Sequence, residues 1–178
     1  MSYWSKMKGS SQSPPRAGRA EMLWSWLGGF LGIAAVAGLN DCFFKGTDLS
    51  LIIGSLGASA VLIFGANKSP LAQPRNVFGG NVLSALIGVA AYKLFPGQIW
   101  LASSVAVATA ILVMHLTKTL HPPGGSTALI AVLGGDGIHA MGYLYAVIPA
   151  GLGSIILLAT GLLFNNLLRS RRYPEFWV

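Results

Sequence analysis

Two short segments of the sequence combine glycine with small and hydroxyl-bearing residues in a way that suits the binding of a small anion. They are Gly57-Ala58-Ser59 and Gly124-Gly125-Ser126-Thr127. Their hydroxyl groups can donate hydrogen bonds, and their glycines let an ion approach the backbone closely. If each segment begins a helix, unpaired N–H groups and the positive end of the helix dipole lie at the same place. Such a site binds an anion without a buried lysine or arginine.

A histidine and two prolines come directly before the second of these segments. His121 could bind an anion, gate the cytoplasmic entrance or carry a proton. Alternatively, it is a polar residue that fixes the turn before Pro122. Pro122 and Pro123 suit the start of a helix, because proline needs no hydrogen-bond partner there. A helix from Pro123 to Gly134 is about 18 Å long, which is shorter than the hydrocarbon core of a bilayer.

Other polar residues lie near the ends of the same apolar runs. Arg75 and Asn76 begin the third run, and Lys118 comes three residues before His121. The two cations would raise the local concentration of an anion, and the alternative for these residues is an ordinary solvated loop. Asn81, inside the third run, either faces a cavity or forms a hydrogen bond between helices.

The sequence argues against several other kinds of chemistry. None of the five acidic residues lies inside an apolar run, so we expect neither a cation site nor a proton relay. Three scattered histidines and a single cysteine argue against a metal site, and we expect no cofactor. A serine and a histidine without an acidic partner make an enzyme improbable. The basic residues form no stripe interleaved with aromatics, so we expect no nucleic-acid partner.

The elements that must position these residues are membrane helices. Of the 178 residues, 53% are apolar and only 10% are charged, against about 25% charged in a soluble domain. A membrane span needs about 20 mostly apolar residues. Six uncharged runs approach or exceed this length, and they cover residues 22–40, 49–67, 76–92, 94–117, 119–135 and 137–168. We therefore predict an all-α, polytopic transmembrane helix bundle in the lipid bilayer.

The distribution of charge favours six crossings, with both termini in the cytoplasm. Six crossings place ten of the 12 lysines and arginines on one side, as the positive-inside tendency requires. If runs two and five only enter and return, four crossings remain. We expect a disordered basic tail at 1–21, one transmembrane domain at 22–170 and a cytoplasmic end at 171–178.

The chain shows a weak internal repeat. Residues 57–62 align with 125–130, and Ser84 aligns with Ser154. The two units, about 22–95 and 96–170, would each hold three segments, so that their orientations in the membrane are inverted. Inverted repeats with broken helices are a recurring transporter design. We expect half-helices in segments 2 and 5 whose N-termini converge near the bilayer midplane. Six short segments enclose little volume, so we also expect a homo-oligomer.

Three motifs, in order, resemble those of the HPP family of integral membrane proteins. They cover residues 57–62, 69–76 and 121–129, and the last contains the His121-Pro122-Pro123 triplet. The resemblance implies a bacterial or plastid membrane protein with about four or more membrane helices. On this basis we expect a bacterial plasma membrane, with a plastid envelope as the alternative. The resemblance also implies nitrite transport, in which cyanobacterial and chloroplast members are implicated. We therefore expect a transporter of a small monovalent anion, most of all nitrite. The alternatives are a passive anion channel and a non-transporting module that senses a ligand or organises a complex.

Overall fold

The structure is a computed structural model that describes residues 2–8, 11–47 and 49–178, and each element of regular secondary structure within these ranges is a helix. The predicted tail includes residues 1, 9 and 10, which lie outside the described residues. The helical elements are α1 (Tyr3–Lys6), α2 (Arg19–Phe43), α3 (Gly54–Ala60), the π-helix η1 (Val61–Gly65), the 3-10 turn η2 (Pro70–Ala72), α4 (Pro74–Leu94), α5 (Ile99–Leu116), α6 (Pro122–Leu133), α7 (Gly135–Met141), the π-helix η3 (Ala146–Gly151) and α8 (Leu152–Asn165).

Four of these helices are long and apolar enough to cross a membrane. They are α2, α4, α5 and the segment formed by η3 and α8, which has a kink at Ile148. The helices in runs two and five, Gly54–Gly65 and Pro122–Leu133, are shorter. These findings confirm the prediction of an all-α, polytopic membrane protein with short helices in segments 2 and 5. The inverted repeat stays a prediction.

Local sequence explains where the two short helices begin and end. Residues Pro122 and Pro123 occupy the first two positions of α6, where a missing N–H costs nothing. Gly134 ends α6, and Gly135 follows with φ +75°, a conformation that favours glycine. Helix α3 follows an extended segment, in which the Leu51 amide donates to Asn40 Oδ1 at 2.8 Å.

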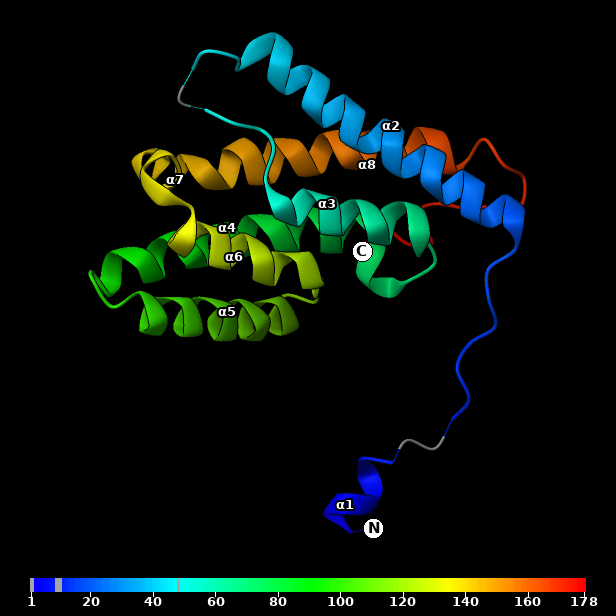
Figure 1. Ribbon diagram of the computed structural model, residues 1–178, viewed down its shortest axis with the longest axis horizontal. Coiled ribbons are helices and arrows are strands. Elements are labelled where there is room, and N and C mark those ends of the chain that lie inside the picture. The colour runs from blue at the N-terminus through cyan, green and yellow to red at the C-terminus, as the bar shows by residue number, and fades with distance from the viewer. Residues whose placement is uncertain (1, 9–10, 48) are drawn as a thin grey trace.

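All six apolar segments run between the two ends of one bundle. In Figure 1, α2 and α8 lie on one side, α5 lies on the other, and α3, α4 and α6 lie between them. At one end, Arg171 contacts both Glu21 at the start of α2 and the carbonyl of Phe64 at the end of η1. The starts of α4 and α6 and the end of α5 lie at this same end, where Arg75 donates to the Thr117 carbonyl.

Basic residues gather at this end, which we call the basic end. It carries Arg19, Lys68, Arg75, Lys118, Arg169, Arg171 and Arg172. The opposite end carries Lys45 and Lys93. The segments alternate in direction between these two ends, and the number of membrane crossings, six or four, stays a prediction.

Glycines let the backbones of α4 and α6 come into direct contact. A Cβ atom at Gly124 would lie 2.8 Å from the Gly80 carbonyl oxygen. A Cβ atom at Gly88 would clash with both the carbonyl oxygen and the Cα of Ala128. Because the neighbouring atoms belong to the backbone, they cannot rotate away. The α4–α6 contact therefore depends on glycine, as do many helix contacts in membranes.

The C-terminal segment packs against the basic end. The guanidinium of Arg171 donates to Glu21 Oε1 at 2.6 Å and to Asn165 Oδ1 at 2.8 Å. The hydroxyl of Tyr173 donates to the Ala72 carbonyl at 2.7 Å. Both side chains are buried. Residues 171–173 thereby connect α2, α8 and the loop that precedes α4.

We expect Gly88→Ala to destabilise the bundle by about 1–3 kcal/mol, because the added methyl group forces α4 away from α6. Thermal unfolding of the purified protein in detergent measures the loss. Gly38→Ala is the matched control, since a Cβ at Gly38 meets nothing within 4 Å. An equal thermal midpoint for both variants would show that the two backbones do not touch.

Candidate functional site

Four of the candidate residues meet in the interior of the bundle. Ser59 of α3, Asn81 of α4, His121 at the N-cap of α6 and Thr127 of α6 join Ser154 of α8 in one group. We call these five residues the polar cluster. Each is 0% exposed. Ionisable and polar groups in such a position are expensive in a membrane and generally have a function or a partner.

The hydrogen bonds of His121 define its tautomer. Its Nδ1 lies 2.8 Å from the Leu71 carbonyl oxygen, which can only accept. Nδ1 therefore carries the proton, and a neutral ring has an acceptor at Nε2. The Ser59 hydroxyl, at 2.8 Å, donates to that nitrogen. The neutral imidazole consequently has a partner on both sides.

Asn81 links the remaining members of the cluster. Its Nδ2 donates to Ser59 Oγ at 3.2 Å and to Ser154 Oγ at 3.1 Å. Its Oδ1 accepts from the Thr127 hydroxyl at 2.7 Å. Both amide protons and the amide oxygen are therefore used. One side chain thereby joins α3, α4, α6 and α8 by the internal pairing that hydrocarbon demands.

Arg75 and Asn76 position the cluster without belonging to it. The Arg75 guanidinium donates to the Thr117 carbonyl at 2.7 Å, and the Asn76 amide donates to the Leu120 carbonyl at 2.9 Å. These bonds hold the extended segment that leads from α5 to His121. Both residues contact backbone carbonyls, so the structure gives them a positioning role at the basic end.

The other candidate residues lie outside the polar cluster. Gly57, Ala58, Pro122, Ser126 and Lys118 are exposed, Gly125 is half-buried, and Pro123 and Gly124 are buried. Three of the exposed residues, Ala58, Pro122 and Ser126, line a shallow surface groove of about 260 Å³ between α3 and α6. The predicted site is therefore divided between a closed interior cluster and an outer face.

The expected convergence of two helix N-termini is wrong, because the antiparallel helices α3 and α6 lie side by side rather than end to end. A Cβ at Gly54, where α3 begins, would lie 4.0 Å from Ile130, near the end of α6. At the start of α6, His121 contacts Ser59, in the second turn of α3. The two positive helix ends therefore lie at opposite ends of the pair.

The predicted binding of an anion by free amides is also wrong. Gly57 to Ser59 lie inside α3, three residues and more after it begins, so the helix itself uses their N–H groups. In α6, Pro122 and Pro123 have no N–H, and the Gly124 amide donates to the His121 carbonyl at 2.8 Å. The donors that remain for a ligand are side chains.

Two residues of the site were not predicted from the sequence. Ser154 was noted only as the counterpart of Ser84, and Tyr145, whose hydroxyl donates to the Thr127 carbonyl at 3.1 Å, was not singled out. The available signal was a hydroxyl group inside an apolar, glycine-rich run. The five cluster side chains provide hydroxyl, amide and imidazole groups and no carboxylate, which suits a small polar or anionic ligand better than a metal ion.

Comparisons with known proteins relate almost the whole chain to one family. A family model described as "HPP, transmembrane region" matches residues 14–174. A transmembrane protein of Dictyostelium discoideum is 44% identical over 178 residues, which cover 98% of this chain and 57% of the relative. A second transmembrane protein of Dictyostelium discoideum is 40% identical over 172 residues, which cover 95% of this chain and 60% of the relative.

The chain thus spans about three fifths of the length of these curated relatives. No solved structure matches it. The expected bacterial or plastid location stays a prediction.

We expect Thr127→Val to lower stability by about 1–3 kcal/mol, because it leaves Asn81 Oδ1 buried without a donor. Ser126→Ala, at the adjacent exposed position, should change stability by less than about 0.5 kcal/mol. Chemical or thermal unfolding of both variants in the same detergent tests the difference. If the two losses are equal, the cluster is not a stabilising network.

Proposed function

The chain belongs to the HPP transmembrane family, and from this premise we propose that it is a membrane transporter of a small monovalent anion, with nitrite the favoured substrate. The observation that carries the proposal is the polar cluster, which is buried where α3, α4, α6 and α8 meet. Nitrite itself is favoured by the resemblance of the three sequence motifs to family members implicated in its transport.

The chemistry of the cluster supports an anion rather than a cation. Its hydroxyl groups and its amide can donate hydrogen bonds, and none of its five side chains carries a negative charge. When the cluster opens, Ser59, Asn81 and Thr127 lose their hydrogen bonds to one another. Their hydroxyl and amide groups then donate to the oxygen atoms of the substrate. Hydrogen bonds to a charged partner are about twice as strong as neutral ones, which offsets the lost internal bonds.

The positive charge at the basic end also supports an anionic substrate. Arg75 and Lys118 lie beside the segment that leads to His121, and Lys118 is exposed. Cations at the entrance of a low-dielectric path raise the local concentration of anions. We propose that this end faces the cytoplasm, together with both termini, and that each protomer of a homo-oligomer holds its own cluster.

Movement of α3 and α4, in the first three-segment unit, against α6 and α8, in the second, would open the cluster. Three cluster hydrogen bonds, Ser59–His121, Asn81–Ser154 and Thr127–Asn81, join these two pairs of helices, so their separation frees the donors. Rocking of one three-segment unit against the other would then alternate access. A passive channel would use the same donors without this alternation.

One observation favours a second candidate function. The hydrogen-bonding groups of the Asn81 amide and the His121 imidazole have partners within the protein, as in a structural network. A membrane module that senses a ligand or organises a complex, without transport, would need no more than this. The two functions differ in whether an ion crosses the membrane.

Proteoliposomes that contain the protein should take up nitrite at mildly alkaline pH, where little neutral acid diffuses through the lipid. Ser59→Ala should lower the uptake rate about tenfold, because it removes one donor to the ion. Ser104→Ala is the matched control, since that hydroxyl is exposed and bonds to the Trp100 carbonyl. The thermal midpoint of each variant separates lost transport from lost folding.

Two results would contradict this proposal. Folded protein without uptake of any anion would favour the non-transporting module. Transport of a cation or a neutral solute alone would contradict the proposed negative charge of the substrate.

The single cysteine reports the orientation of the chain. Cys42 is exposed near the end of α2, opposite to the basic end. If the basic end is cytoplasmic, a membrane-impermeant maleimide should label Cys42 in intact cells. Cys42→Ser is the control for specific labelling. Labelling that requires opened cells would place the basic end outside.

A further inference from the structure

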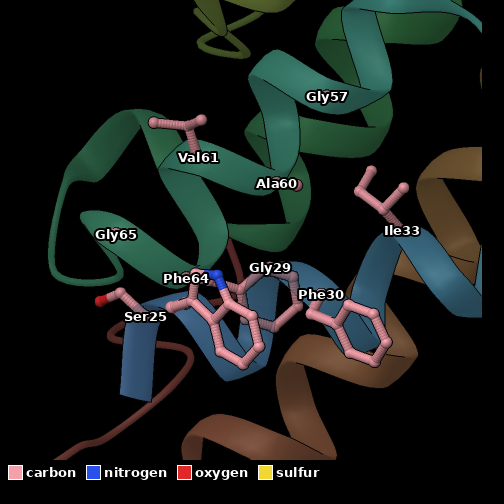
Figure 2. A pocket seen from close by; sticks show the side chains of 10 residues that line it. Ser25, Gly29, Phe30, Ile33, Gly57, Ala60, Val61, Phe64 and Gly65 are labelled. Carbon is pink, nitrogen blue, oxygen red and sulfur yellow. The ribbon is translucent and has the colours of Figure 1, made fainter. Parts of the chain in front are cut away.

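An apolar groove runs along the side of the bundle between α2 and the helix formed by α3 and η1. Figure 2 shows Phe30 and Ile33 on the α2 side, and Ala60, Val61 and Phe64 on the other. The groove has a volume of about 500 Å³, which lies within the range of about 300–1,000 Å³ for ligand sites. Because it opens on the lateral surface of a membrane protein, its surroundings are lipid chains.

Glycines create the space in this groove. A Cβ added at Gly29 or Gly57 meets nothing within 4 Å. On the same helix, a Cβ added at Gly28 or Gly32 would lie 2.5 Å from the ring of Phe64. Gly28 and Gly32 therefore serve close packing between helices, whereas Gly29 leaves open volume. The groove is thus hollow because of its sequence and does not result from loose packing.

A polar pocket adjoins one end of the groove. It has a volume of about 410 Å³, lies at the basic end and shares Gly65 with the groove. Ser25 also connects the two, because it lines the groove and accepts from Arg171 Nη2 at 2.8 Å. A ligand with an apolar chain and a polar head could therefore occupy both spaces at once.

The charge of the polar pocket is positive. Arg171 and Glu21 both line it, and they neutralise each other in an ion pair of 2.6 Å. Lys68 also lines it and is exposed, and it forms no ion pair within residues 2–8, 11–47 and 49–178. Ser69 Oγ accepts from the Leu71 amide, which leaves the hydroxyl proton free to donate. These groups suit a phosphate.

We propose that the groove and the polar pocket together bind one anionic phospholipid. An acyl chain lies between α2 and α3, beside Gly29 and Gly57, and the phosphate lies near Lys68 and Ser69. A helix of a second copy could fill the apolar groove, but it would leave the adjoining positive pocket without a partner. The continuity of an apolar space with a positive one is what favours a lipid.

Native mass spectrometry of the purified full-length protein tests this inference. The probes are phosphatidylglycerol and phosphatidylcholine with identical acyl chains, added separately in detergent. We expect phosphatidylglycerol to bind more tightly. Lys68→Gln should weaken its binding about fivefold, because one interfacial cation is lost. Gly29→Leu should weaken the binding of both lipids, because the leucine fills the groove.

Two matched variants control for general effects. Gly38→Leu adds the same side chain to an exposed position of α2 that lines neither space, where a Cβ meets nothing within 4 Å. Lys45→Gln removes a cation at the opposite end of the bundle. Neither should change lipid binding. Thermal midpoints close to that of the unchanged protein show that all four variants fold.

Three results would overturn the inference. The first is equal binding of the two lipids, unaffected by Lys68→Gln. The second is a loss of lipid binding with Gly38→Leu as large as that with Gly29→Leu. The third is a dimer that Gly29→Leu dissociates, which would assign the groove to a second copy of the chain.

Discussion

A polar group buried in hydrocarbon must find its partner within the protein, and this requirement governs the interior of the bundle. Asn81 meets it with three hydrogen bonds to three other helices. His121 meets it with a backbone carbonyl on one side and a serine on the other. Each bond constrains the position of the helix that supplies it, since no water is present to replace a lost partner. The helix arrangement and the candidate site therefore have the same origin.

This requirement also explains the glycines of α4 and α6. Short side chains such as serine and threonine reach a partner only if the helix backbones come close. Gly80, Gly88 and Gly124 permit that approach, because a Cβ at any of them would meet the opposing chain. The antiparallel orientation of α3 and α6 adds a favourable alignment of their dipoles. Their side-by-side position also separates the two positive helix ends, which would have to converge in an anion site of free amides.

Much of the fold could be predicted from the sequence, because composition and proline position act locally. The apolar runs predicted the membrane helices, and Pro122 and Pro123 predicted the start of α6. The start of α3 at Gly54 was not predicted, since no proline or capping residue marks it. That α3 and α6 lie side by side rather than end to end depends on tertiary packing, which no local pattern encodes.

The residues of the candidate site also divide into those that the sequence predicted and those that depend on tertiary packing. Ser59, His121 and Thr127 stood out by type and spacing, and the structure brings them together. The positioning role of Arg75 and Asn76 depends on carbonyls more than forty residues away in the sequence, so it could not be predicted. Ser154 carries a single hydroxyl in an apolar helix, where a serine can bond to the backbone of its own helix. Only the position of Asn81 in the folded protein shows that Ser154 belongs to the cluster.

The C-terminal segment gives the end of the chain an unusual influence over its centre. Tyr173 bonds to the Ala72 carbonyl, and Leu71, the preceding residue, supplies the carbonyl that holds His121. Only two hydrogen bonds and the link between adjacent residues therefore separate Tyr173 from the imidazole of His121. A binding partner or a protease that displaced residues 171–173 at the membrane surface would loosen the histidine from outside the bilayer, without entering the bundle.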